Sequence, residues 1–176
     1  FIDERLNQSH LVGAGMAYTP QIEPFANGST IAMVFIAMIP RAIWPDKPVQ
    51  AGSGNLVSQY TGMGFADGTA VGIGHILELY VNGGTDVVLV GMFLLGIVMR
   101  LIDKRLMAAA FSGNWTGILV PYLVGQCFLN VIGSMVEIGS SLAASVLLGL
   151  VLAKGIKIWS PSAAPSPQQS SVRPAR

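Results

Sequence analysis

The chain has 176 residues, of which 52% are hydrophobic and only 11% are charged, and its formal net charge is +1. Because an ordinary soluble domain carries about 25% charged residues, this composition indicates a membrane protein, and we expect no nucleic-acid partner. The single cysteine, Cys127, excludes an intramolecular disulfide framework and a cysteine-based metal site. The chain starts at Phe1 without the basic-then-apolar pattern of a signal peptide, so we expect the C-terminal part of a longer membrane protein.

The first region, residues 1–85, is predicted to lie outside the hydrocarbon core, on the extracytoplasmic side or at the interface. Pro20 and Pro24 near its start resist a continuous helix. Residues 29–39 are apolar, but a stretch of about 10–14 residues suits an interfacial or re-entrant segment better than a full span. Pro40 ends this segment.

Residues 40–48 read PRAIWPDKP, and the three prolines predict a stiff, non-helical ribbon. Trp44 suits the water–lipid interface and would hold Arg41 and Lys47 close to the headgroup plane. These two cations could bind a lipid-linked phosphate or diphosphate. The alternative is that both side chains only snorkel to anionic headgroups.

Residues 51–74 are rich in glycine and polar side chains and are predicted to form a flexible loop. Their glycine spacing matches neither a P-loop nor a dinucleotide fingerprint. Asn55 could hydrogen-bond sugar hydroxyls, although asparagine is also an ordinary loop residue.

The segment His75–Tyr80 leads into an apolar run and could be helical, which would place His75 and Glu78 on one face. A partly desolvated Glu78 could have a raised pKa and act as a general base, with His75 as its partner or as a second base. The alternatives are a structural Glu78 that caps a helix or pairs with Arg41 or Lys47, and a His75 bonded to a loop carbonyl. So few potential ligands predict no metal site.

Three later apolar runs, residues 86–102, 115–136 and 138–158, are predicted to form a membrane anchor. The fold class is therefore an all-α, multi-spanning membrane protein with short interfacial helices in an extracytoplasmic region. Residues 159–176 are rich in Pro, Ser, Ala and Gln and are predicted to be a disordered tail.

Basic residues set the predicted topology, because short loops rich in Lys and Arg stay cytoplasmic. One group falls between the first and second predicted spans, and another follows the third; they are Arg100, Lys104 and Arg105, and Lys154, Lys157, Arg173 and Arg176. The C-terminus is thus expected in the cytoplasm.

Two motifs resemble a known family. The string IPRAIWPDKP at residues 39–48, after Thr19-Pro20 and Gly28, is followed about thirty residues later by GIGHILELYVNGG. Together they resemble the C-terminal part of bacterial O-antigen or oligosaccharide repeat-unit polymerases of the Wzy type. The spans behind them resemble that family only in hydropathy.

The resemblance implies a multi-pass glycosyltransferase at the outer face of the bacterial cytoplasmic (inner) membrane. It would transfer a growing glycan from undecaprenyl diphosphate onto a new lipid-linked repeat unit, without a metal or other cofactor. Arg41 would stabilise the departing diphosphate, and Glu78 or His75 would deprotonate the acceptor hydroxyl. We expect further substrate contacts from Lys47, Arg5, Trp44, Asn55 and Tyr80. The expected partners are the lipid-linked oligosaccharide, the membrane and a chain-length regulator protein.

Two other functions stay open at this point. An O-antigen ligase would use the same lipid-linked donor but deliver the glycan to a lipid A core. A non-enzymatic transporter of lipid-linked glycans would be expected to place ionisable residues within its spans, whereas here they gather outside the predicted spans.

Overall fold

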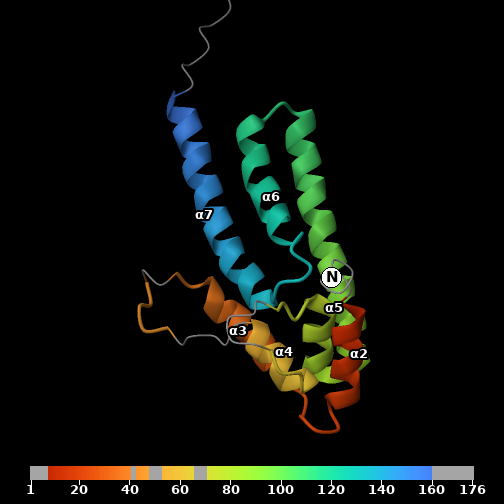
Figure 1. Cartoon of the computed structure of the whole chain (residues 1–176). Coiled ribbons are helices and arrows are strands. Elements are labelled where there is room, and N and C mark those ends of the chain that lie inside the picture. Colours follow the sequence, from red (N-terminus) through yellow and green to blue (C-terminus); the bar gives the residue numbers. More distant parts are fainter. Residues whose placement is uncertain (1–7, 41–42, 48–52, 66–70, 160–176) are drawn as a thin grey trace, which may run out of the picture.

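The computed structural model describes residues 8–40, 43–47, 53–65 and 71–159. Within these ranges the structure is all-helical and contains no strand, which confirms the all-α part of the predicted class. The helices are α2 (Ser9–Tyr18), α3 (Ser29–Met38), α4 (Ser53–Thr61), α5 (His75–Phe111), α6 (Trp115–Cys127) and α7 (Met135–Trp159). Figure 1 shows α6 and α7 beside the long part of α5, with α2, α3, α4 and the start of α5 gathered at one end.

Prolines close the first helices as the sequence predicts. Helix α2 ends before Pro20, and the short apolar helix α3 ends two residues before Pro40. The Nζ of Lys47 donates to the carbonyl oxygens of Ala37 and Ile39, at 3.2 and 3.1 Å, and so satisfies acceptors at the end of α3.

The prediction of an unbroken loop over residues 51–74 is wrong, because α4 lies within it. Leu56, Val57 and Tyr60 are buried on one face of α4. They form a core with Ile73, Leu77 and Val81. The apolar residues in this polar stretch are few and widely spaced. The sequence therefore did not reveal that one side of α4 packs against the core.

Helix α5 is a helical hairpin. Gly83 and Gly84 have non-helical dihedrals, and Gly84 has φ +77° and ψ −161°, a region open essentially to glycine alone. A Cβ on Gly91 would lie 2.5 Å from a Leu79 methyl, so the second half runs back along the first. The carbonyl of Val81, released by the kink, accepts the Ala26 N–H at 2.8 Å.

The helix predicted over residues 115–136 is shorter in the structure, since α6 ends at Cys127 and turns fill the chain to Ser134. Thirteen residues span about 20 Å, less than the ~30 Å of a hydrocarbon core. The third predicted run is confirmed as a helix, which starts earlier, at Met135.

Two helices in the described part of the chain, α5 and α7, are long and apolar enough to cross a membrane, whereas three spans were expected. None of the most apolar 18-residue window of α5 is buried, so that window follows the buried residues that end at Gly84. The candidate span therefore belongs to the second half of the hairpin. Exposed apolar helices of this length favour a membrane protein.

Candidate functional site

The first half of α5 carries a buried polar face. His75, Glu78 and Asn82 follow one another at intervals of three and four residues, so they lie on the same side of the helix. Their exposed fractions are 3%, 0% and 5%. Polar side chains are rarely buried so completely without a structural or functional reason.

Glu78 joins α5 to the N-terminus of α7. Its Oε2 accepts the backbone N–H of Met135, the first residue of α7, at 2.6 Å. Ser134 and Glu137 form a reciprocal capping box on the same helix end: the Glu137 N–H donates to Ser134 Oγ, and the Ser134 N–H donates to Glu137 Oε2, both at 3.3 Å. The buried carboxylate therefore lies where backbone N–H groups favour negative charge.

Asn82 ties the same cluster to α3. Its Nδ2 donates to Thr30 Oγ1 and to the Glu78 carbonyl, both at 2.6 Å. Thr30 is itself buried, with 2% of its surface exposed. The cluster of Thr30, His75, Glu78, Asn82 and the Met135 N–H, which we call the α5 polar cluster, thus holds three helices together.

Three atoms of the α5 polar cluster are buried without a hydrogen-bond partner among the described residues: His75 Nε2, Glu78 Oε1 and Asn82 Oδ1. Leaving one such group unpaired costs on the order of 1–3 kcal/mol. Three together on one helix face are unusual in a native structure. They mark positions where a substrate atom could complete the hydrogen bonding.

Burial raises the pKa of Glu78 to about 7. The Met135 N–H and the nearby Thr30 hydroxyl favour the carboxylate and oppose this shift, while the negative charge of Glu137 adds to it. Glu78 precedes the kink and so lies outside the spanning part of α5. At neutral pH a large share of the Glu78 side chain is ionised and the rest is protonated. The ionised form can accept a proton, and the protonated form can donate one.

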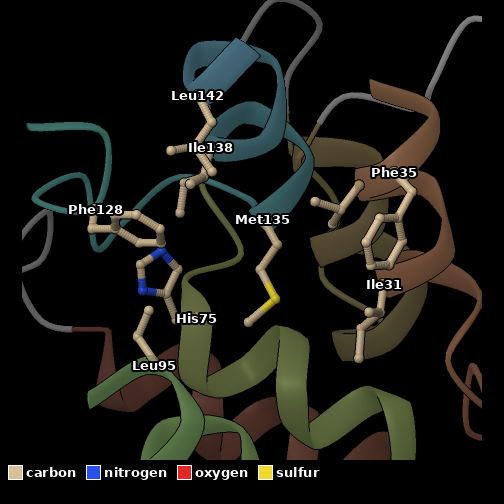
Figure 2. Close-up of a pocket in the computed structure, with 9 residues that line it drawn as sticks. Ile31, Phe35, His75, Leu95, Phe128, Met135, Ile138 and Leu142 are labelled. Carbon is tan, nitrogen blue, oxygen red and sulfur yellow. The ribbon is translucent and has the colours of Figure 1, made fainter. Parts of the chain in front are cut away.

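Burial lowers the pKa of His75, so its imidazole is neutral at neutral pH. The backbone at His75 is held by the α6–α7 connection. The Gly74 N–H donates to the Ile132 carbonyl at 3.0 Å, and the His75 N–H donates to the Val131 carbonyl at 3.4 Å. The His75 ring faces an apolar cavity beside Phe128, Met135 and Ile138 (Figure 2). The His75–Glu78 face expected from the sequence is therefore formed and enclosed by protein.

The other predicted site residues that the structure describes do not gather at this cluster. Arg5 and Arg41 lie outside the described residues. Lys47 is held at the end of α3 by two carbonyl oxygens. Trp44 is 41% exposed, and Asn55 is exposed on α4.

Tyr80, predicted to bind substrate, has a contact within the protein. Its hydroxyl donates to the Thr19 carbonyl at 3.2 Å, and its ring packs edge-on against Phe25 at 6.0 Å between centroids. Tyr80 is only half-buried, so part of the side chain still reaches the surface.

Sequence reasoning missed Thr30, Asn82 and the Met135 N–H. Asn82 could have been found, because it follows Glu78 by one helical turn and sits directly before a Gly-Gly pair. Thr30 and Met135 carried no such signal, since their roles depend on how α3 and α7 pack against α5. In the described ranges no group of three His, Cys, Asp or Glu side chains could hold a metal ion.

Comparison with curated proteins and with solved structures finds no match for this chain. A family model described as a domain of unknown function (DUF8712) matches residues 1–130. The matched range contains Thr30, His75, Glu78 and Asn82, whereas Met135 and the rest of α7 follow it. Because the match covers well over half of the sequence, the chain belongs to the DUF8712 family.

Proposed function

We propose that this chain is part of a membrane glycosyltransferase that polymerises lipid-linked oligosaccharide repeat units into a surface polysaccharide. The donor is a glycan on undecaprenyl diphosphate, and the acceptor is a hydroxyl of a new lipid-linked unit at the outer face of the bacterial cytoplasmic membrane. The resemblance of residues 39–48 and 72–84 to Wzy-type polymerases suggests this reaction. The α5 polar cluster supplies a group suited to its chemistry.

The observation that carries the proposal is the buried Glu78 carboxylate with one unpaired oxygen and a pKa of about 7. Oε2 is fixed by the Met135 N–H, which leaves Oε1 for a substrate proton. A general base works best when its pKa lies near the operating pH. An ordinary surface glutamate, with a pKa near 4.5, would be a weaker base.

In the proposed reaction Glu78 Oε1 takes the proton of the acceptor hydroxyl as that oxygen attacks the anomeric carbon of the donor sugar. The bond from the anomeric carbon to the diphosphate oxygen breaks, and the diphosphate leaves with the electron pair. The leaving group needs positive charge. Since the ammonium of Lys47 is occupied at the end of α3, Arg41 is our candidate for that role.

The proposed orientation follows from the basic residues of the second half of α5. Arg100, Lys104 and Arg105 are exposed near the end of the helix away from the kink. If that end is cytoplasmic, the kink and the α5 polar cluster belong to the outer part of the molecule. Helix α7 would then return its C-terminal end to the cytoplasm.

The test is Glu78→Gln in the full-length protein, with membrane abundance measured first and the length distribution of surface glycan then read on a gel. The amide keeps an acceptor for the Met135 N–H but cannot take a proton. We expect a loss of polymer on the order of 10²–10⁴-fold in rate, seen as single repeat units. Asp103→Asn is the control, because that exposed carboxylate pairs with Arg100 in the second half of α5 and takes no part in the α5 polar cluster.

Normal glycan length in a stable Glu78→Gln variant would rule out Glu78 as the base. Long polymer that accumulates on its lipid carrier in cells that lack the protein would point instead to a ligase. A parallel Arg41→Ala variant tests the leaving-group assignment separately: we expect short glycan at unchanged abundance, and an unchanged length distribution would make Arg41 a headgroup anchor.

A further inference from the structure

An open groove of about 400 Å³ runs along the second half of α5. It is lined by residues of this helix, namely Met92, Phe93, Gly96, Ile97, Arg100 and Leu101. Gly96 leaves its floor open, because nothing lies within 4 Å of the Cβ position of that residue. The apolar side chains along the groove are exposed, and Arg100 is the one charged residue among the described residues that line it. The groove is therefore an apolar track with a cation near one end.

The groove faces away from α6. On the other side of the same helix, the Cγ2 of Ile102 lies 3.6 Å from the Cβ position of Gly125 in α6. Successive residues of an α-helix turn by about 100°, which places Arg100 roughly opposite Ile102 and puts Gly96 on the Arg100 side. In a bilayer the groove would be open to lipid.

The length of the groove matches one leaflet of a bilayer. Leu101 follows Met92 by nine positions, which corresponds to about 14 Å of helix. This is about half of the ~30 Å of a hydrocarbon core. Arg100 lies at the end farther from the Gly83–Gly84 kink. The acyl chain of a lipid in one leaflet fits this length, with its headgroup at the Arg100 end.

Cations gather where that headgroup would lie. Lys104 follows Arg100 by one helical turn on the same side of the helix, and Arg105 is the next residue. The pair of Arg100 and Asp103 is exposed and therefore weak, and it uses one of the five guanidinium N–H donors. Arg and Lys bind phosphate oxygens, and each basic residue beside a span strengthens binding to anionic lipid about fivefold.

We propose that this groove binds an anionic phospholipid, with one acyl chain along Phe93, Gly96 and Ile97 and the phosphate at Arg100 and Lys104. The charges select the anionic headgroup, and the length of the groove selects a lipid that occupies one leaflet. The site requires that the second half of α5 crosses a bilayer, and it does not depend on the proposed polymerisation. A lipid held in this way fixes the depth of α5 in the membrane.

The test is photo-crosslinking of the full-length protein in phosphatidylcholine nanodiscs that contain a trace of a lipid with a diazirine on its acyl chain. Two probes share this acyl chain, and one has a phosphatidylglycerol headgroup while the other has a phosphatidylcholine headgroup. Labelled residues are mapped by mass spectrometry. We expect the anionic probe to label Phe93 and Ile97 at least fivefold more than the zwitterionic probe does. Equal labelling by the two probes, or no label in the groove, would overturn the proposal.

Two variants each remove one positive charge, but from different helices. Arg100→Gln removes the cation of the groove, whereas Lys154→Gln removes an exposed cation of α7, on the other side of α6 (Figure 1). Arg100→Gln should reduce the preference for the anionic probe about fivefold, and Lys154→Gln should leave it unchanged. Equal reductions in the two variants would show attraction to the overall charge of the protein and no specific site.

Two glycines provide a matched pair of variants that tests the groove itself. Nothing lies within 4 Å of the Cβ position of Gly96 or of Gly13, an exposed residue of α2. Gly96→Leu fills the groove and should reduce the labelling of Phe93 by the anionic probe at least fivefold, while Gly13→Leu should leave it unchanged. Thermal unfolding establishes that both variants are folded. Equal labelling of the two folded variants would overturn the proposal.

An isoprenoid phosphate is also apolar and anionic, and competition separates it from a phospholipid. Unlabelled phosphatidylglycerol should reduce the groove label in proportion to its share of the lipid, and undecaprenyl phosphate at the same small share should compete no better. If undecaprenyl phosphate removes the label where an equal amount of phosphatidylglycerol does not, the occupant is an isoprenoid and the proposal is wrong. Labelling needs no turnover, so Glu78→Gln should keep it whatever that variant does to glycan length.

Discussion

The two halves of α5 are adjacent in sequence but differ in which of their side chains are buried. Between His75 and Asn82 most side chains are buried, and three of the buried residues are polar. After the kink, large apolar side chains are exposed instead, with Leu89 at 66% and Phe93 at 69%. The first half is therefore stabilised by protein contacts and the second by surroundings that accept apolar surface, as a lipid bilayer does.

The glycine pair makes this division possible. Without a reversal, the first half would extend from the end of the span and could not pack beside it. The Asn82 amide and the Ala26 N–H bind the carbonyl oxygens of Glu78 and Val81 at the end of the first half. Donors from α5 itself and from the segment before α3 thus satisfy these carbonyl groups beside the kink.

The largest expected difference in stability is between alanine variants of two leucines of α5, Leu77 and Leu89. Leu77 is fully buried against α2, where its methyl carbon occupies the space beside Gly15, whereas Leu89 is largely exposed. We expect Leu77→Ala to lower the free energy of unfolding by about 2–5 kcal/mol, because it leaves a cavity. Leu89→Ala should change it by less than about 0.5 kcal/mol. Thermal or denaturant unfolding of the two variants in the same detergent checks this, and equal losses would contradict the division of α5.

The raised pKa of Glu78 predicts a pH-dependent stability. Since the folded-state pKa is about 7 and the ordinary value is 4.5, the folded protein binds a proton between these values that the unfolded chain releases. The wild type should therefore lose on the order of 3 kcal/mol as pH rises from below 4.5 to above 7.

Glu78→Gln removes this contribution, so its stability relative to the wild type should improve with rising pH over the same window. Comparing the two proteins cancels the opposite contribution of His75, whose lowered pKa removes stability as pH falls below about 6.5. If the free energies of unfolding of the two proteins changed in parallel from pH 4 to pH 8, Glu78 would have an ordinary pKa and the prediction would be wrong.

The kink itself is tested by Gly84→Ala. Because Gly84 has φ +77° and ψ −161°, a Cβ there is strained whatever space surrounds it, and we expect a loss of about 1–3 kcal/mol. Gly96→Ala is the control in the second half: nothing lies within 4 Å of its Cβ position, and alanine favours the helix by about 1 kcal/mol. The unfolding temperature should fall for Gly84→Ala and rise slightly for Gly96→Ala; a neutral Gly84→Ala would mean that the reversal is not needed for stability.

Hydropathy and proline positions predicted the helical class, the short apolar segment at residues 29–39, which contains α3, and the helical character of the last apolar run. They overestimated the second run, because the residues after Cys127 are apolar but turn back to meet Gly74 and His75. Helix α4 was missed because only three of its described apolar residues, Leu56, Val57 and Tyr60, are buried. Both errors concern segments whose structure is decided by contacts with distant parts of the chain.

The shared face of His75 and Glu78 followed from helical spacing, but its burial did not. A sequence shows that Glu78 is polar; it does not show that α3 and α7 close over it. Lys47 illustrates the same limit, because its expected contact with a phosphate and its observed contact with the α3 carbonyls use the same ammonium group. Distances between elements decide such cases.

The smallest expected difference concerns one polar contact in each half of α5. Asn82 Nδ2 reaches Thr30 Oγ1 in a buried site, whereas Arg100 pairs with Asp103 at 3.2 Å with side chains that are 76% and 55% exposed. Asn82→Ala should cost about 1–3 kcal/mol, because the buried Thr30 Oγ1 loses the hydrogen bond that Asn82 donates. Arg100→Ala should cost between about 0 and 1 kcal/mol, because water competes for both charges. Unfolding measured at low and at high salt separates them: only the Arg100 effect should shrink as salt rises, and a salt-sensitive Asn82→Ala would mean that water reaches the α5 polar cluster.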